Sequence, residues 1–225
     1  MNRQEFKDSV YSELSKVSKA IANPVRLEII DLLVHGPLSV EQIAYNIDQS
    51  VANASQHLQK LKNAKLVKIE REGNFIYYSL TGDNVFRAWI ALRDLGIAYN
   101  AEVKKIIEDF RAGYGSGLDA IDLDMLKKML ENNEVILLDV RPEEDFNRGH
   151  IHKAICVPID KLKAFIQKLP HDKTVVAYCR GPLCIYSDMA VAMLKDHGYD
   201  AKRTDEGYPE WKMKGYPIQK TQNHK

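Results

Sequence analysis

The sequence lacks any apolar run long enough to cross a membrane as a helix. Such a helix needs about 20 consecutive apolar residues, whereas charged residues make up 28% of the 225 residues and interrupt every hydrophobic stretch. The segment 1–14 also lacks the apolar core of a secretory signal. The sequence therefore predicts a cytoplasmic protein with no membrane partner.

An excess of one charge and a disulfide framework are both missing. The 32 Lys and Arg residues against 31 Asp and Glu residues give a net charge of +1, so any affinity for nucleic acid must come from the local placement of charges. The three cysteines all lie after residue 150. They are too few for a disulfide scaffold and indicate local thiol chemistry instead.

A glycine-rich segment, 112–118, divides the chain into two regions of different pattern. The pattern before it is helical with one strand-like hairpin. After it, helical stretches alternate with short apolar runs such as 135–140 and 174–178, which are typical of parallel strands buried on both faces. We therefore expect a mainly α domain over 1–111, a linker over 112–118, and an α/β domain with a central parallel sheet over 119–225.

The first region contains the pattern of a helix-turn-helix. A short helix is expected over 40–47, followed by a turn at 48–50 in which Ser50 caps a second helix. On the second helix, Val51, Ala54, Leu58, Leu61 and Lys65 fall on one arc, which predicts the core face. The other side collects amide, hydroxyl and basic side chains that suit a DNA major groove: Asn53, Ser55, Gln56, His57, Gln59 and Lys60. The alternative is a solvated face without a partner.

The segment after this helix predicts a wing. Residues 66–71 and 75–80 read as two strands of a β-hairpin whose polar tip is 72–74, and Arg71 beside the tip is expected to reach the DNA backbone. With this hairpin, residues 17–82 resemble the ArsR/SmtB-type winged helix-turn-helix repressors, and the stretches that carry the resemblance are 22–30, 55–58 and 71–74. The resemblance implies a homodimer that binds double-stranded operator DNA of dyad symmetry.

Apolar residues along 84–110 support the dimer expectation, because they exceed what a small winged domain can bury. The alternative is packing within one protomer. Many members of the family sense metals, but this half contains no cysteine, and its two histidines, His35 and His57, belong to no cluster of soft ligands. We therefore expect no metal site and no cofactor, and a signal that enters through the second half.

In the second half, the buried run 174–178 ends at Cys179, and a short loop then leads into a helix expected over 185–195. Backbone N–H groups and the positive end of the helix dipole gather at such a loop. They lower a thiol pKa from its usual value of about 8.5, so Cys179 is expected to be a nucleophile at neutral pH. The alternative is a buried and inert cysteine.

Residues 119–218 carry a second resemblance, to the rhodanese-like sulfurtransferases, through the stretches 138–142, 149–151, 154–158, 179–184 and 206–217. This resemblance implies that Cys179 attacks a sulfane sulfur donor, forms a persulfide and passes the outer sulfur to an acceptor. The loop residues Gly181, Pro182 and Leu183 would then hold the anionic sulfur. By the same resemblance Asp139, Arg141 and His150 are framework residues, and Asp145 stands where the family usually has a glutamate.

The loop departs from the family at Cys184, a position that often carries an anion-binding residue. Only Arg180 then remains in the loop to hold an anionic donor, which disfavours thiosulfate. Cys184 could instead attack a modified Cys179 and close a disulfide or polysulfide, or it could simply pack at the helix start. Cys156 is expected in the core, and the pair His150 and His152 has no third ligand nearby for zinc.

Together these features predict a transcriptional regulator whose operator affinity follows the sulfur or redox state of Cys179, with Arg180 and Cys184 in the same site. One alternative is a working sulfurtransferase that also regulates its own operon. Another is a rhodanese-like module that either lacks turnover or reduces an oxyanion such as arsenate. The small molecule at the loop, whether a sulfur donor, an oxidant or an oxyanion, stays open at this point.

Overall fold

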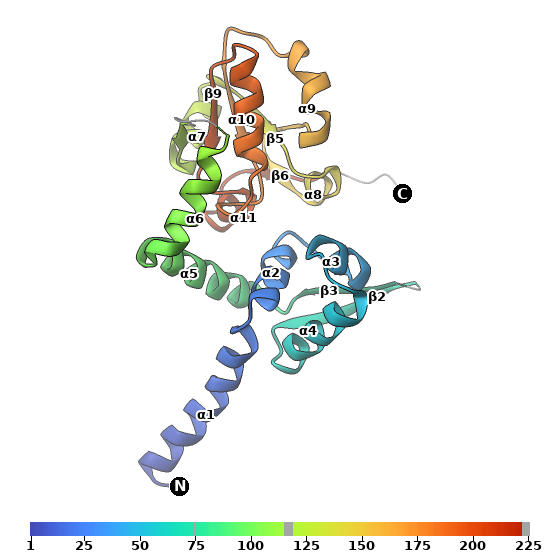
Figure 1. The fold of residues 1–225 in the computed structure, drawn as a ribbon, viewed down its shortest axis with the longest axis vertical. Helices are drawn as coiled ribbons and strands as arrows, with labels where there is room; N and C mark the ends of the chain where they lie inside the picture. Colours follow the sequence, from blue (N-terminus) through green and yellow to red (C-terminus); the bar gives the residue numbers. More distant parts are fainter. Residues whose placement is uncertain (74, 115–118, 222–225) are drawn as a thin grey trace. The chain divides into compact units, whose positions relative to one another are not determined.

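The computed structural model describes residues 1–73, 75–114 and 119–221, which form two compact units, 1–99 and 100–225 (Figure 1). The division places the helix at 101–112 in the second unit, although its apolar pattern continues that of the preceding helix. The limits 1–111, 112–118 and 119–225 stay predictions, and residues 115–118 of the linker lie outside the described residues. Within the described ranges, no helix is both long and apolar enough to cross a membrane.

The first unit is a helix-turn-helix followed by a β-hairpin wing, as predicted. The strands form an antiparallel sheet in the order β1-β3-β2. The elements, in chain order, are α1 (Arg3–Ile21), α2 (Pro24–Leu33), β1 (Leu38–Ser39), α3 (Val40–Asn46), α4 (Val51–Asn63), β2 (Val67–Glu72), β3 (Phe75–Leu80) and α5 (Asp83–Tyr99).

Local sequence explains how α4 begins and ends. The Ser50 side chain accepts a hydrogen bond from the Asn53 amide at 3.2 Å, which confirms the predicted N-cap. The core face holds Ala54, Leu58 and Leu61, all fully buried. The prediction is wrong for Val51, which is 47% exposed in the first turn, and for Lys65, which lies beyond the helix end with a φ of 58° in the turn toward β2. Asn74 at the predicted wing tip lies outside the described residues.

The joint between α1 and α2 is built by two polar side chains from the stretch that resembles the repressors. The Asn23 side chain caps α2 by accepting from the Arg26 amide at 3.2 Å. The buried Arg26 guanidinium donates to the carbonyls of Ala20 and, at 3.0 Å, Lys19. These carbonyls belong to the last turn of α1, where no intrahelical donor remains, so Arg26 closes the end of one helix against the start of the next.

Part of α5 packs inside its own unit. Trp89 and Ile90 are buried, and the Trp89 indole N–H donates to Asp31 Oδ1 at 2.8 Å. For these two residues the alternative interpretation, packing within one protomer, is correct.

The second unit is an α/β domain around a parallel sheet of five strands in the order β4-β9-β8-β5-β7. A small antiparallel pair, β6 with β10, lies apart from this sheet. The elements are α6 (Ala101–Ala112), β4 (Ala120–Ile121), α7 (Leu123–Glu131), β5 (Val135–Asp139), α8 (Glu143–Arg148), β6 (His150–Ile151), β7 (Ile155–Cys156), α9 (Ile159–Phe165), a 3-10 turn (Ile166–Lys168), β8 (Thr174–Tyr178), α10 (Tyr186–Asp196), β9 (Ala201–Thr204), α11 (Tyr208–Met213) and β10 (Ile218–Gln219).

Alternate residues of β5 and β8 enter two separate cores, one on each face of the sheet. Leu138 and Ala177 join the core that includes residues of α9 and α10. Leu137 and Val176 join the core that includes residues of α7 and α11. Both faces are thus buried, which explains why these strands read as continuous apolar runs.

A buried ion pair fixes the carboxyl end of β5. Arg141 Nε donates to Asp139 Oδ1 at 2.9 Å and Nη2 to Oδ2 at 2.6 Å, while Nη2 also donates to the Gly149 carbonyl at 2.8 Å. The Tyr178 hydroxyl at the end of β8 donates to the same carboxylate and accepts from the Ile151 amide. Asp139 and Arg141 are almost completely buried, as expected of framework residues.

We expect Arg141→Met to lower the free energy of unfolding of the second unit by about 3–5 kcal/mol, because the substitution leaves a buried carboxylate without its cation. Urea unfolding followed by circular dichroism measures the change. The matched control is Lys161→Met, which removes a surface pair between Lys161 Nζ and Glu143 Oε2 at 3.1 Å and should have little effect. Equal stabilities of the two variants would contradict the framework role.

Candidate functional site

The predicted nucleophile, Cys179, follows β8 directly, and its loop leads into α10. The residue is buried, at 2% exposed, on the sheet face covered by α10. Its Sγ lies 3.5 Å from Ser187 Oγ in the first turn of α10, 3.4 Å from the Cys184 carbonyl oxygen and 3.9 Å from the Gly181 carbonyl oxygen. The loop thus wraps around the sulfur.

The surroundings of Cys179 favour its thiolate form. Burial alone would raise the pKa of Cys179. Hydrogen bonds from the Cys184 thiol and the Ser187 hydroxyl, together with those of the Gly181 and Ser187 backbone, outweigh burial and lower that pKa to about 7. This is the direction that the strand, loop and helix pattern predicts. The contribution of Ser187 was missed, although a hydroxyl in the first helical turn after such a loop was visible in the sequence.

The other two cysteines are held as thiols. The pKa of Cys184 is raised because its S–H donates to Cys179 and because the group is buried. Burial, followed by the nearby carboxylates of Asp139 and Glu143, raises the pKa of Cys156 to about 11. Cys156 is half-buried in β7 and belongs to neither sheet core. Cys179 is therefore the one cysteine of the three that is activated at neutral pH.

The Arg180 guanidinium forms an ion pair with a carboxylate through its Nε. Its Nε donates to Asp145 Oδ2 at 2.8 Å, and Asp145, on α8, is buried and also lies 3.3 Å from Arg148 Nη1. The sequence-based interpretation gave Arg180 the task of holding an anionic donor. In the structure Arg180 is paired with the carboxylate of Asp145, which it shares with Arg148. Sequence reasoning missed this role of Asp145.

The backbone of Gly207 packs directly against the cysteine loop. A Cβ atom on Gly207 would lie 2.5 Å from the Arg180 carbonyl carbon and the Gly181 nitrogen, and 2.6 Å from the Cys179 oxygen. The Tyr208 amide donates to the same Cys179 oxygen at 3.3 Å. Within the loop, the Cys184 amide donates to the Gly181 carbonyl at 3.0 Å, and Gly181 has a φ of 144°, which favours glycine. Positions 181–183 are thus held as a tight turn between the two cysteines.

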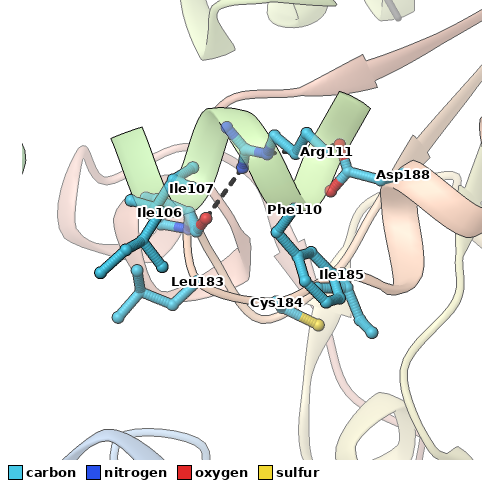
Figure 2. Close-up of a pocket in the computed structure, with 9 residues that line it drawn as sticks. Ile106, Ile107, Phe110, Arg111, Leu183, Cys184, Ile185 and Asp188 are labelled. Carbon is cyan, nitrogen blue, oxygen red and sulfur yellow. Dashed lines mark hydrogen bonds and ion pairs between the residues drawn. The ribbon is translucent and has the colours of Figure 1, made fainter. Parts of the chain in front are cut away.

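Helix α6 contacts the outer side of the loop. Arg111 Nη2 donates to the Pro182 carbonyl at 2.8 Å, and Arg111 Nε lies 3.4 Å from Asp188 Oδ1. A cavity of about 290 Å³ lies between α6 and the loop. Figure 2 shows the side chains that line it, Arg111 and Asp188 among them. The cavity lining also includes Phe110 and Cys184.

The predicted DNA-reading residues divide into two groups. Five of them are exposed on α4 and on the wing: Ser55, Gln56, Gln59, Lys60 and Arg71. Asn53 and His57 are half-buried. The Asn53 amide nitrogen donates to Gln49 Oε1 at 2.6 Å, and His57 Nδ1 is buried with no hydrogen-bond partner among the described residues. Burial, with the charges of Arg26 and Lys60, lowers the pKa of His57, so its ring belongs to the inner flank of the helix.

No group of three or more His, Cys, Asp or Glu side chains in the described ranges is placed to hold a metal ion. His150 and His152 lie in different surroundings. His150 is buried and stacks on Phe146 with ring centroids 3.6 Å apart, whereas His152 is exposed.

Comparisons with known proteins agree with this two-part architecture. A helix-turn-helix domain family matches residues 21–70, and the rhodanese-like domain family matches residues 122–214. An HTH-type transcriptional regulator of Mycobacterium tuberculosis is 37% identical over 216 residues, which cover 96% of this chain and 94% of the relative.

Two solved structures each resemble one half of the chain. The homodimeric winged helix-turn-helix DNA-binding domain of a possible ArsR-family regulator from Mycobacterium bovis is 32% identical, with a TM-score of 0.43, and covers 45% of this chain and 94% of that one. A rhodanese-related protein from Thermoplasma volcanium is 26% identical, with a TM-score of 0.41, and covers 45% of this chain and 97% of that one.

The pKa of Cys179 can be measured from the ultraviolet absorbance of the thiolate, as the difference between the wild-type protein and Cys179→Ser. Because the pKa is lowered to about 7, the thiolate should be present above that pH and disappear as the pH falls through it. Cys184→Ala removes a donor to the sulfur and should move the midpoint upward, whereas Cys156→Ser should leave it in place. A wild-type midpoint at the ordinary thiol value of about 8.5 would contradict the activated site.

Proposed function

The chain belongs to the ArsR-type helix-turn-helix transcriptional regulators that carry a C-terminal rhodanese domain, and we propose that sulfur chemistry at Cys179 controls its affinity for operator DNA. The observation that carries the proposal is the cysteine loop, in which hydrogen bonds lower the pKa of the buried Cys179 to about 7 while Cys184 donates its proton toward it. A buried activated thiolate next to a second thiol suits a sensor of reactive sulfur.

In the proposed complex with DNA, α4 enters the major groove. Gln56, Gln59 and Lys60 are exposed along this helix, and amide and basic side chains are the types that contact base edges and phosphates. Arg71, exposed on β2, would contact the backbone beside the groove. Asn53 would need to release Gln49 before it could reach a base, so it is a weaker candidate.

We propose that the regulator is a homodimer that works in the cytoplasm, where its operator lies. Helix α1 has no buried residue, yet it carries an apolar stripe of Phe6, Val10, Leu14 and Val17, each at least 40% exposed. The spacing of four, four and three residues places these side chains on one helix face. A second copy of the chain would cover this face, and two α4 helices would then bind an operator of dyad symmetry.

The proposed reaction begins with attack of the Cys179 thiolate on a sulfane sulfur of a polysulfide or hydropersulfide. The S–S bond of the donor breaks, and Cys179 carries the transferred sulfur as a persulfide. The leaving group is a thiolate when the donor is a hydropersulfide and a shorter polysulfide anion when it is a polysulfide. The Cys184 sulfur then attacks the inner sulfur of Cys179, so that a disulfide forms and hydrogen sulfide leaves with the proton of Cys184. The two thiols lose two electrons in total, and the transferred sulfur gains them.

The ion pair of Arg180 with Asp145 bears on the choice of donor. An anionic donor such as thiosulfate would need a cation near Cys179, and the loop cation is already bound to a buried carboxylate. A hydropersulfide or a polysulfide can deliver a sulfane sulfur without this cation. The proposed donor class is therefore reactive polysulfide rather than thiosulfate.

The test is to expose reduced protein to polysulfide, to locate added sulfur or a disulfide by mass spectrometry, and to titrate operator DNA by fluorescence anisotropy before and after. We expect modification of Cys179 and a change of about tenfold or more in operator affinity, equivalent to about 1.4 kcal/mol of coupling. Cys179→Ser should abolish both effects, Cys156→Ser should preserve both, and thiosulfate should act weakly.

Each alternative function gives a different result in the same experiment. Modification of Cys179 with unchanged operator affinity, together with turnover onto an acceptor thiol, would replace the sensor by an independent sulfurtransferase. An unmodified Cys179 would leave an inert module or an oxyanion reductase, and arsenate consumption would distinguish these two.

For the DNA-binding face, we expect Gln56→Ala to weaken binding to the cognate operator by about 1–3 kcal/mol relative to random DNA, because a base-edge contact is lost. Lys60→Ala should instead lower the slope of log affinity against log salt by about one. Gln167→Ala, at an exposed position of the second unit, is the control. An unchanged ratio of operator to random DNA affinity in Gln56→Ala would show that α4 does not read the operator through this face.

A further inference from the structure

Helix α6 follows the DNA-binding unit in the sequence and belongs to the unit that contains Cys179. The sequence pattern assigned this helix to the DNA-binding domain. At its start, Asn100 alone separates it from α5, and the Asn100 side chain caps α6 by accepting from the Glu102 amide at 3.0 Å. At its end, the last turn contacts the loop between the two reactive cysteines. Helix α6 therefore follows the DNA-binding unit directly in the sequence and also contacts the loop that contains Cys179.

The contact centres on one side chain, Arg111, which is about three-quarters buried, with 26% of its side chain exposed. Its Nη2 donates to the Pro182 carbonyl at 2.8 Å, and its Nε lies 3.4 Å from the carboxylate of Asp188. Asp188, at 1% exposed in the first turn of α10, also lies 3.1 Å from Arg203 Nε. Arg111 thus ties α6 at once to the middle of the loop and to the helix that follows it.

Apolar contacts surround this polar tie. Ile106, Ile107 and Phe110 of α6 line the same cavity as Leu183 and Cys184 of the loop, as Figure 2 shows. Because the Cys184 carbonyl oxygen lies 3.4 Å from Cys179 Sγ, a single loop residue contacts both the Cys179 sulfur and the α6 cavity.

A sulfur atom added to Cys179 would meet neighbouring atoms of the loop. Cys179 is 2% exposed, and the Cys184 and Gly181 carbonyl oxygens lie 3.4 and 3.9 Å from its Sγ. On another side, the Gly207 backbone packs against the backbone of residues 179–181. Close-packed interiors transmit such an insertion as displacement. The side of the loop that can yield is the outer one, where the cavity of about 290 Å³ lies and where Arg111 holds the Pro182 carbonyl.

We propose that Arg111 is a positioning residue that couples the chemical state of Cys179 to α6, and that α6, rather than the segment 113–118, relays that state toward the DNA-binding unit. The inference rests on the proposed function, because it supplies the path by which modified Cys179 changes operator affinity. In the reduced protein Arg111 holds α6 on the loop, and modification displaces the Pro182 carbonyl and releases this tie.

The test compares Arg111→Gln with the wild-type protein and with Lys105→Gln, which removes one charge at an exposed position of the same helix. Each protein is treated with polysulfide, Cys179 modification is quantified by mass spectrometry, and operator affinity is measured before and after. We expect full modification in all three proteins, an affinity change of about tenfold in the wild type and in Lys105→Gln, and a change of less than about twofold in Arg111→Gln. Arg111→Lys keeps a cation near Asp188 and should restore part of the response.

A second variant tests the competing path. Insertion of the four residues Gly-Ser-Gly-Ser after Gly113 lengthens the connection that follows α6 and leaves α6 itself intact. The change in operator affinity on polysulfide treatment should therefore persist. Loss of the response in this variant but not in Arg111→Gln would overturn the relay and assign the coupling to the connection.

The outcomes separate the two proposals. A wild-type protein whose affinity ignores Cys179 modification would overturn the proposed function and the relay with it. A wild-type response that Arg111→Gln retains in full would overturn the relay alone. Because Cys179 modification is measured in every sample, a variant whose second unit does not fold is recognised by unmodified or over-modified cysteines. If Arg111→Gln fails in this way, the response of Arg111→Lys decides whether the relay holds.

Discussion

The buried ion pair between Asp139 and Arg141 is the constraint on which the second unit depends. It joins the end of β5 to the end of β8 through the Tyr178 hydroxyl and to the start of β6 through the Gly149 carbonyl. Tyr178 is the residue immediately before Cys179. The ion pair therefore fixes where β8 stops and the cysteine loop starts.

The electrostatics of the loop follow from a balance between burial and hydrogen bonding. Burial disfavours a thiolate, so a sulfur at 2% exposed would ordinarily be an inert thiol. Here the donors around Cys179 outweigh burial, and one of them is a second thiol. The same pairing that lowers the pKa of Cys179 raises the pKa of Cys184, so the surroundings favour a thiolate at Cys179 and a thiol at Cys184. The Arg180 charge is balanced separately by Asp145, which leaves the hydrogen bonds, rather than a neighbouring cation, as the source of activation.

Much of this architecture could be predicted from the sequence because it depends on local signals. The strand at 174–178 and the Ser50 cap are in the structure where the apolar run and the serine placed them. What could not be predicted depends on contacts between distant residues. The partner of Arg180 lies 35 positions away on α8 and that of Arg111 lies 71 positions away in the loop. The steric role of Gly207 also arises only when its backbone meets the cysteine loop. Val51 is the first residue of α4 and is 47% exposed there, so helical periodicity alone did not show that this position lies outside the core.

The break at Asn100 shows the same limit and bears on how a signal could travel. Apolar spacing runs through 84–110 without interruption, and only the Asn100 cap divides it into a helix that packs on Asp31 through Trp89 and a helix that packs on the cysteine loop through Arg111. A tenfold change in DNA affinity requires about 1.4 kcal/mol of difference between two states. One hydrogen bond to a charged group contributes about 1.5–3 kcal/mol, so the tie between Arg111 and the Pro182 carbonyl is large enough to account for such a change. A regulator built this way needs no large rearrangement, because the making or breaking of one partly buried contact supplies the required free energy.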